Sequence, residues 1–314
     1  MSGKNRFLRF GAAAAAAALL FTMSATGCGA SAGGDETFES LTLQREEVHV
    51  SVPGMKQTLR IAYLSDLHVL YADESVDPER RAEVEGRVQS FANGRQVSSA
   101  DQWPLWVAWL NREKPDYVLF GGDMVDYASG ANVSALQEGL DALQVPYMYL
   151  RADHDTEPFY LLQGQGVAPA GTDSGNGVFV QEYDAVILVG WDNATSQLSE
   201  AGYAAIEEAC GRGKPVVLVT HVPIEPQEDT SLADASRAAF GNRSLLWGFG
   251  DNYYYPEGAT RDLLRLIYAE DTPIVEVLSG HLHFTWDGAI NARVHEHVFG
   301  PAFQGCAGIV TIGP

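Results

Sequence analysis

The chain has 314 residues, of which 46% are hydrophobic and 10% aromatic, and this composition is too apolar for a disordered protein. It carries 20 lysine and arginine residues against 41 aspartate and glutamate residues, which gives a net charge of −21. So acidic a chain is not expected to bind nucleic acid, because it has few cations to displace counterions from a phosphate backbone. Three cysteines are too few for a disulfide-stapled scaffold, and the 32 glycines show no period typical of fibrous or repeat proteins.

The first 27 residues have the features of an export signal. Three basic residues open the chain: Lys4, Arg6 and Arg9. Residues 10–23 form a small-residue and apolar run that is too short to cross a bilayer comfortably. The run ends in Ala25-Thr26-Gly27-Cys28, which resembles the bacterial lipobox, although Ala25 stands where leucine is usual. We therefore expect residues 1–27 to be a lipoprotein signal peptide and Cys28 to carry lipid; the alternative is an ordinary secretory signal cleaved nearby.

A tether and a single domain are predicted to follow the signal. Residues 28–56 read as a tether and a first strand region, and the Ser, Gly and Ala content of residues 31–35 suits a flexible spacer above a membrane. Residues 57–314 read as one domain, since no shift in composition marks a second. Insertions at about 71–100 and 223–258 interrupt it, and loops of this length in a compact domain often serve as lids or binding loops. The protein is thus expected to be extracytoplasmic, anchored to the bacterial cell surface.

Strand and helix patterns alternate from residue 59 onward. Short apolar runs rich in β-branched and aromatic residues predict strands buried on both faces, at 59–64, 117–120, 145–150, 186–189, 215–219 and 274–278. Helical patterns lie between them, at 78–91, 105–112, 133–143, 200–210 and 260–269. Asn132 is the expected N-cap of the third of these helices. The alternation predicts a layered α/β domain.

Aspartate and histidine residues follow five of the predicted strands. In chain order these residues are Asp66 and His68, Asp123 and Asp126, Asp153 and His154, His221, and His281 and His283. The chain has eight histidines, and five of them lie at these strand ends. Open α/β sheets bind ligands at the carboxyl ends of their strands, and converging carboxylates and imidazoles suit one or two metal ions.

Spacing suggests how some of these side chains would converge. Asp66 and His68 are two residues apart, as are His281 and His283, so strand alternation would point each pair to one side. The glycines beside these residues suit tight turns where the backbone approaches the site: Gly121, Gly122 and Gly280.

The five motifs together resemble the signature of the calcineurin-like metallophosphoesterases. That signature reads Asp-x-His, Gly-Asp-x-x-Asp, Gly-Asn-His-Asp/Glu, His and Gly-His-x-His, and the chain matches it over about residues 59–285. The resemblance implies a four-layer α/β/β/α sandwich with mixed sheets and a site for two metal ions (Mn, Fe, Zn or a mixed pair). It implies that one metal is held by Asp66, His68, Asp123 and His283. Asp123 would bridge to a second metal held by Asp153, His221 and His281.

The resemblance also implies an activity, the hydrolysis of a small phosphoester, either a monoester or a diester. Two metals would activate a hydroxide for attack on phosphorus, His154 would protonate the leaving oxygen, and Asp126 would orient His154. One alternative is a catalytically degenerate surface lipoprotein of the same fold that binds metal or a ligand. A purple acid phosphatase fits less well, since Tyr127 lies one residue after the place where that family has tyrosine. A purely structural lipoprotein would leave the strand-end histidines unexplained.

The third motif departs from the family pattern. It reads Ala152-Asp153-His154-Asp155, so Asp153 replaces the usual asparagine and Ala152 the usual glycine. Asp153 can ligate a metal as asparagine can, but it adds a negative charge. Ala152 suggests a slightly different backbone path.

Other candidate residues have simpler interpretations. His49, His295 and His297 alternate with other residues in strand patterns and are expected on solvated faces. Arg151 could reach a phosphate oxygen or be a surface charge, and tyrosines 253–255 could line a substrate pocket or pack a long loop. We expect Cys210 and Cys306 to be unpaired, because nothing marks them as neighbours.

The lipidation hypothesis is tested by replacing Cys28. Acyl chains anchor a protein by about 0.8 kcal/mol for each buried methylene. Cys28→Ala is therefore expected to release the protein from the membrane fraction or to leave an uncleaved precursor. Fractionation and mass spectrometry of the mature N-terminus measure both, and an unmodified N-terminus with unchanged fractionation would contradict the hypothesis.

Overall fold

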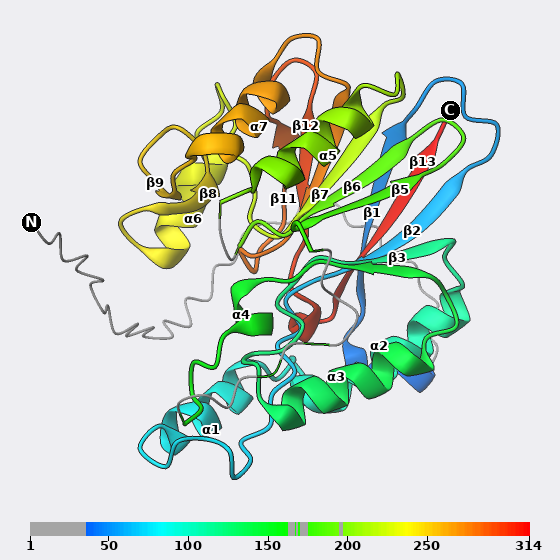
Figure 1. The fold of residues 1–314 in the computed structure, drawn as a ribbon. Helices are drawn as coiled ribbons and strands as arrows, with labels where there is room; N and C mark the ends of the chain where they lie inside the picture. Colours follow the sequence, from blue (N-terminus) through cyan, green and yellow to red (C-terminus); the bar gives the residue numbers. More distant parts are fainter. Residues whose placement is uncertain (1–35, 163–166, 168, 170–174, 195–196) are drawn as a thin grey trace, which may run out of the picture. The chain divides into compact units, whose positions relative to one another are not determined.

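The computed structural model describes residues 36–162, 167, 169, 175–194 and 197–314 (Figure 1). All of them belong to one structural unit. The predicted signal peptide, Cys28 and residues 31–35 lie outside the described residues. Within the described part of the chain, no helix is both long enough and apolar enough to cross a bilayer.

The first sheet has the strand order β1-β13-β2-β3-β4. Its strands are β1 Gln44–Ser51, β2 Leu59–Leu64, β3 Tyr117–Phe120, β4 Tyr147–Tyr149 and β13 Cys306–Gly313. Strands β2, β3 and β4 run parallel, whereas the last strand of the chain, β13, inserts between β1 and β2 and runs antiparallel to β2. The carboxyl ends of β2, β3 and β4 therefore share one edge of the sheet.

The second sheet has the strand order β11-β12-β10-β7-β6-β5. Its strands are β5 Val178–Glu182, β6 Ile187–Trp191, β7 Val216–Thr220, β10 Ile274–Ser279, β11 Trp286–Ala289 and β12 His295–Val298. Strands β6, β7, β10 and β12 run parallel, and β5 and β11 are antiparallel edge strands. Both sheets are thus mixed, as predicted.

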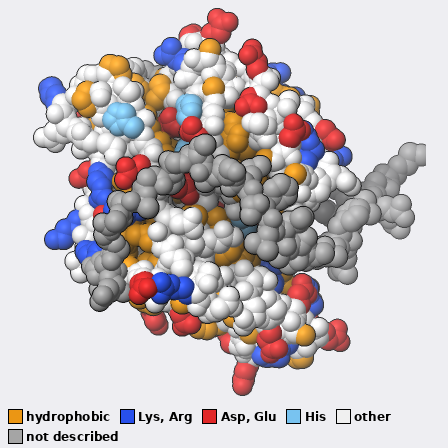
Figure 2. All heavy atoms as spheres, turned by 180° about the vertical axis from the view of Figure 1, so that it is seen from behind, with side chains coloured by type: hydrophobic (Ala, Val, Ile, Leu, Met, Phe, Trp, Pro, Cys, Tyr) orange, Lys and Arg blue, Asp and Glu red, His pale blue; other side chains and the backbone are white. Residues whose placement is uncertain are grey.

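Helices cover the outer face of each sheet (Figure 1). Helices α2 Ser99–Glu113 and α3 Gly130–Ala142 and the 3-10 turn η1 Glu36–Leu41 flank the first sheet, and α5 Glu200–Cys210 and α7 Gly258–Tyr268 flank the second. One hydrophobic core lies between each sheet and its helices, and another lies between the two sheets. In the core between the sheets, the rings of Tyr63 and Phe299 stack with centroids 4.3 Å apart. This is the predicted four-layer α/β/β/α sandwich, and its surface carries many scattered acidic side chains (Figure 2).

Several boundaries differ from the predicted ones because side chains cap the helices earlier. Helix α2 begins at Ser99 rather than at residue 105, and the Ser98 hydroxyl accepts a hydrogen bond from the backbone N–H of Asp101 at 3.1 Å. The N-cap of α3 is Ser129, not Asn132. The Asn132 amide instead binds loop backbone, accepting from the Tyr71 N–H at 2.8 Å and donating to the Tyr127 carbonyl at 3.0 Å.

Neither insertion is a long loop. Residues 71–100 contain helix α1 Arg81–Ser90, within the predicted 78–91, and the start of α2. Residues 223–258 contain α6 Ser231–Phe240 and a two-stranded sheet of β8 Ser244–Trp247 and β9 Asn252–Tyr254. The interpretation of 223–258 as a loop was wrong because its strands are short and lack clear alternation, so tertiary packing forms them.

The solvated-face prediction is wrong for His297 and holds for His49. His297 is buried at the edge between the two sheets, where Nε2 lies 3.3 Å from Glu46 and Nδ1 lies 3.2 Å from Asp287. His295 is half-buried against Glu276. Carboxylates from neighbouring strands make these contacts, and sequence alternation alone cannot reveal them. His49 is exposed, and Cys210 and Cys306 are free thiols, as predicted.

Glu296 on β12 provides a test of how burial affects stability. Its carboxylate is fully buried and accepts hydrogen bonds from the Ile224 N–H at 3.1 Å and the Ser279 hydroxyl at 2.9 Å. Burial raises the pKa of Glu296 from 4.5 to about 8, although both donors oppose the shift. The folded state therefore retains a proton that the unfolded state loses, so this group's contribution to stability falls as the pH rises from about 5 to 8.

Glu296→Gln is expected to remove this pH dependence, because glutamine does not ionise. The free energy of unfolding of the variant relative to the unmodified protein should rise by on the order of 1–3 kcal/mol between pH 5 and pH 8. Urea unfolding at the two pH values measures the difference. Glu47→Gln, at an exposed position on β1, is the matched control and should show little change. Parallel pH profiles for all three proteins would contradict the expectation.

Candidate metal centre

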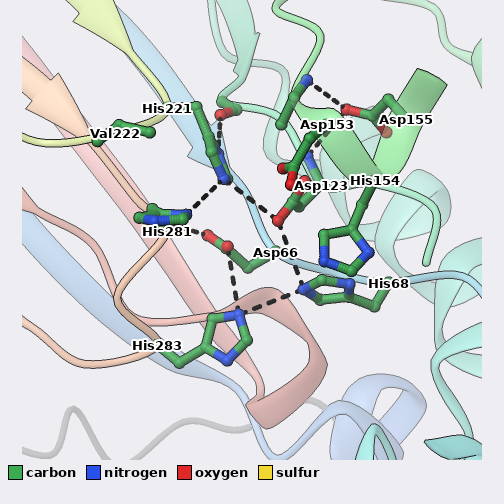
Figure 3. A network of polar contacts seen from close by, with 12 residues as sticks. Asp66, His68, Asp123, Asp153, His154, Asp155, His221, Val222, His281 and His283 are labelled. Atoms are coloured by element: carbon green, nitrogen blue, oxygen red, sulfur yellow. Dashed lines mark hydrogen bonds and ion pairs between the residues drawn. The ribbon is translucent and has the colours of Figure 1, made fainter. Parts of the chain in front are cut away.

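The strand-end residues lie together at one edge of the sandwich (Figure 3). Those from the first sheet follow β2, β3 and β4, and those from the second follow β7 and β10. Their side chains are Asp66, His68, Asp123, Asp153, His154, His221, His281 and His283. Two chain segments far apart in sequence thus contribute to one site.

The backbone of the site is left-handed at five predicted ligands. The φ angles are 54° at Asp66, 51° at His68, 53° at Asp123, 71° at His281 and 53° at His283. Non-glycine residues in this region cost on the order of 1–3 kcal/mol each, and such residues concentrate at functional sites.

Strand alternation is therefore not what aims these side chains. Asp66 and His68 lie beyond the end of β2, and their N–H groups donate to the carbonyls of Gly122 and Asp123 at 3.0 and 2.9 Å. Gly122 has a φ of 97°, and a Cβ there would lie 2.9 Å from the His221 ring, so only glycine fits. The two loops hold each other in place, and that pairing sets the direction of the ligands.

Three groups of side chains are close enough to share a metal ion. Within each group the ligand atoms lie within 4.8 Å of one another. The groups are Asp66, His68 and His283; His68, Asp123 and His154; and Asp123, His221 and His281. His68 and Asp123 each belong to two groups, so the groups form a continuous row. The first and third groups draw on the residues that the resemblance assigns to two metal positions, but the first group lacks Asp123 and the third lacks Asp153.

Several buried ligand atoms have no hydrogen-bond partner among the described residues. These atoms are Asp66 Oδ1, Asp123 Oδ1, Asp153 Oδ1 and His281 Nε2. An unpartnered buried polar atom costs about 1–3 kcal/mol, and more when it is charged. Three carboxylate oxygens and an imidazole nitrogen are of the donor types that fit borderline divalent metals. The residues present therefore fit a metal site.

The electrostatics of the site also favour a cation. Although burial opposes it, the charges of Asp123, Asp66 and Asp153 raise the pKa of His221 to about 10. Burial and the neighbouring His221 lower the pKa of His281 to about 3, which keeps that imidazole neutral and able to ligate. A site that draws a proton onto one histidine is a site of strong negative potential.

Asp155 has a supporting role that the sequence analysis did not assign. Its buried carboxylate accepts hydrogen bonds from the N–H groups of residues 123, 124, 125 and 152 and from the Tyr149 hydroxyl, at 2.8–3.2 Å. Burial and the charge of Asp123 raise the pKa of Asp155 to about 6, and the donors oppose the shift. Asp155 thereby fixes the backbone of the second motif. The signature that the chain resembles has Asp or Glu at this position, and this match was the sequence feature that could have indicated a role for Asp155.

The departures in the third motif are accommodated without strain. Ala152 has an extended backbone, with φ −109° and ψ −179°, so glycine is not required there. Asp153 lies beside Asp123 in Figure 3 but belongs to none of the three ligand groups. Burial and the charge of Asp123 raise the pKa of Asp153. The site therefore holds an additional carboxylate at close range to Asp123.

His154 is positioned differently from the expectation. Its Nδ1 lies 2.6 Å from the backbone carbonyl of Asp126 and 3.5 Å from the carboxylate Oδ1 of that residue. The Asp126 carboxylate is engaged instead by Arg87 and lies 3.2 Å from His68 Nδ1. The carbonyl is thus the closer partner of His154, and Asp126 contacts two histidines of the site.

Aromatic residues surround the ligands. The ring of Tyr254, from β9, lies 5.8 Å from the His281 ring, and Phe159 lies 5.0 Å from His154. Of the three tyrosines, Tyr253 and Tyr255 are exposed and Tyr254 borders the site. Arg151 lines a neighbouring cavity of about 420 Å³, and its guanidinium donates to the Pro169 carbonyl.

Comparison with known proteins places the chain by family and by fold. The model of the calcineurin-like phosphoesterase family matches residues 59–284. No curated protein matches the chain significantly. A solved dimetal phosphatase from Danio rerio is similar in structure, with a TM-score of 0.50 and 13% identity over 78% of this chain and 88% of that one. At this identity the likeness shows the fold.

A second solved structure is more distant. The phosphopantetheinyl hydrolase of Mycobacterium tuberculosis has a TM-score of 0.35 and 13% identity, over 80% of this chain and 92% of that one. The family model spans the five motifs and most of the sandwich, from the first residue of β2 to beyond His283. The chain therefore belongs to the calcineurin-like phosphoesterase family.

Proposed function

We propose that the protein is a two-metal hydrolase of small phosphoesters. The observation that carries the proposal is the continuous row of three ligand groups joined by His68 and Asp123. Family membership supports phosphoesterase activity, and the unpartnered buried oxygens support the metals. When bound, two metal ions would polarise the phosphoryl group and make a water nucleophilic near neutral pH.

The residues of the chain have distinct roles in this proposal. Asp66, His68 and His283 hold one ion, and His221 and His281 hold the other. Asp123 contacts both groups, since its Oδ2 lies 3.2 Å from His221 Nε2 and 3.8 Å from His68 Nε2. Asp153 completes the second position or adds charge beside it.

His154 is the proposed general acid. Burial opposes its protonation, but the charges of Asp123, Asp126 and Asp153 raise the pKa of His154. The contact of Nδ1 with the Asp126 carbonyl directs Nε2 away from that loop. A proton on Nε2 is then available for the leaving oxygen.

The proposal places this chemistry outside the cytoplasmic membrane. The basic start, the short apolar run and Cys28 support export and a lipid anchor. The substrate would be a phosphoester that reaches the cell surface.

A substrate and metal panel tests the proposed function. The purified protein, stripped of metal, is supplied with Mn, Fe, Zn or Ni and assayed on generic phosphomonoesters and phosphodiesters. Turnover that requires added metal supports the hydrolase. Two bound ions without turnover on any ester would favour a degenerate member that binds metal alone.

The charge of Asp153 is expected to weaken the binding of anions. Removing one negative charge near the metals should tighten inhibition by inorganic phosphate roughly ten-fold, since the phosphate lies beyond direct contact and is partly solvated. Asp153→Asn should therefore lower the inhibition constant for phosphate while both ions stay bound. Asp262→Asn, an exposed substitution on α7, is the control. An unchanged inhibition constant and metal preference would mean that Asp153 is not a ligand.

Substitutions of His154 and His281 are expected to have different effects on catalysis and on metal binding. His154→Ala is expected to keep both ions and to lose about 10²–10⁴-fold in kcat, with a smaller loss for esters with good leaving groups. His281→Ala is expected to lose one ion. Elemental analysis beside steady-state kinetics measures both outcomes. One ion fewer in the His154 variant would make His154 a ligand, as its place in the second ligand group allows.

A further inference from the structure

The helix inserted after β2, α1, is linked to the candidate metal centre through Asp126. Arg87, on α1, donates through Nε to Asp126 Oδ2 at 2.7 Å, and its terminal nitrogen contacts Asp126 Oδ1. The Asp126 side chain is fully buried, and that of Arg87 is 21% exposed. A bidentate pair of this kind fixes the carboxylate in position as well as neutralising it.

The same carboxylate contacts a predicted metal ligand. Asp126 Oδ1 lies 3.2 Å from His68 Nδ1. The opposite nitrogen, His68 Nε2, faces the other ligands and lies 3.2 Å from His283 Nε2. Arg87, Asp126 and His68 therefore form a chain from the inserted helix to the metal centre.

A second contact from α1 holds the His68 ring. Phe91, at the end of the helix, stacks on it with a centroid distance of 4.2 Å and an interplanar angle of 11°. The Arg87 guanidinium lies over the rings of Phe91 and Tyr160, 5.0 and 5.3 Å from their centroids. The imidazole thus has the Asp126 carboxylate at its edge and the Phe91 ring on its face.

We propose that Arg87 is a positioning residue for His68, acting through Asp126 to set the affinity of the first metal position. The proposal rests on the ligand role of His68 in the proposed function. A buried carboxylate without a counter-charge is strongly unfavourable, so loss of Arg87 would let Asp126 move from its position. That movement would release the imidazole, whose orientation depends on its outer partner.

Metal titration of the full chain tests the proposal. Demetallated protein is titrated with Mn²⁺ or Zn²⁺ in a calorimeter, and Co²⁺ spectra report the ligand geometry. Arg87→Gln should weaken the affinity of the protein for one of the two ions about 10–100-fold and shift the Co²⁺ absorption bands. Arg87→Lys keeps the charge but loses the bidentate geometry. Its metal affinity should therefore lie between those of Arg87→Gln and the unmodified protein.

Arg81 offers a matched control on the same helix. Its guanidinium donates to the carbonyls of Ala72 and Asp73 at 3.2 and 2.8 Å, so it secures the inserted segment without touching Asp126. Arg81→Gln should change metal affinity by no more than about three-fold and leave the Co²⁺ spectrum intact.

The outcomes separate this proposal from the proposed function. If Arg87→Gln bound metal as tightly as the unmodified protein, the proposed role of Arg87 would be overturned. Equal losses of metal affinity in the Arg81 and Arg87 variants would also overturn it. Failure of the unmodified protein to bind metal would overturn both proposals. Metal binding with the predicted order of variants but no ester hydrolysis would overturn the proposed function alone.

Discussion

The concentration of carboxylates at one sheet edge is the constraint on which the rest of the site depends. Asp66, Asp123, Asp126 and Asp155 are all buried there, and each buried charge needs compensation. The structure compensates them differently. Backbone N–H groups and a tyrosine hydroxyl surround Asp155, and an arginine pairs with Asp126. Among the described residues, one oxygen of Asp66 and one of Asp123 have no hydrogen-bond partner, so these two carboxylates are open to a cation.

Backbone hydrogen bonds between neighbouring loops hold these carboxylates in place. The loop after β2 donates to the loop after β3, and Asp155 binds the N–H groups of the latter loop. Left-handed residues are tolerated because these bonds over-determine their conformation. The sandwich contributes the frame, since β13 fixes β2 from the other side. A substitution that loosens either loop would therefore disturb several ligands together.

Short-range patterns explain what could be predicted from the sequence. The strands at 59–64 and 117–120 and the helix at 200–210 match the structure, because apolar periodicity and flanking polar residues define them. The ordered motifs located the site because strand ends of an α/β fold meet at one edge. The burial of His297 and the engagement of Asp126 by Arg87 arise from tertiary contacts between distant segments, which no local pattern encodes.

The same constraint couples metal binding to stability. The charge of Asp123 disfavours the ionised forms of Asp66 and Asp153, and a proton drawn onto His221 offsets only part of this repulsion. An ion that binds the folded protein and not the unfolded chain removes that repulsion and stabilises the fold by mass action. Because His68 and Asp123 are shared between ligand groups, an ion bound at one position would order residues of the next. Under our proposal, the inserted helix would then influence every ligand group that contains His68.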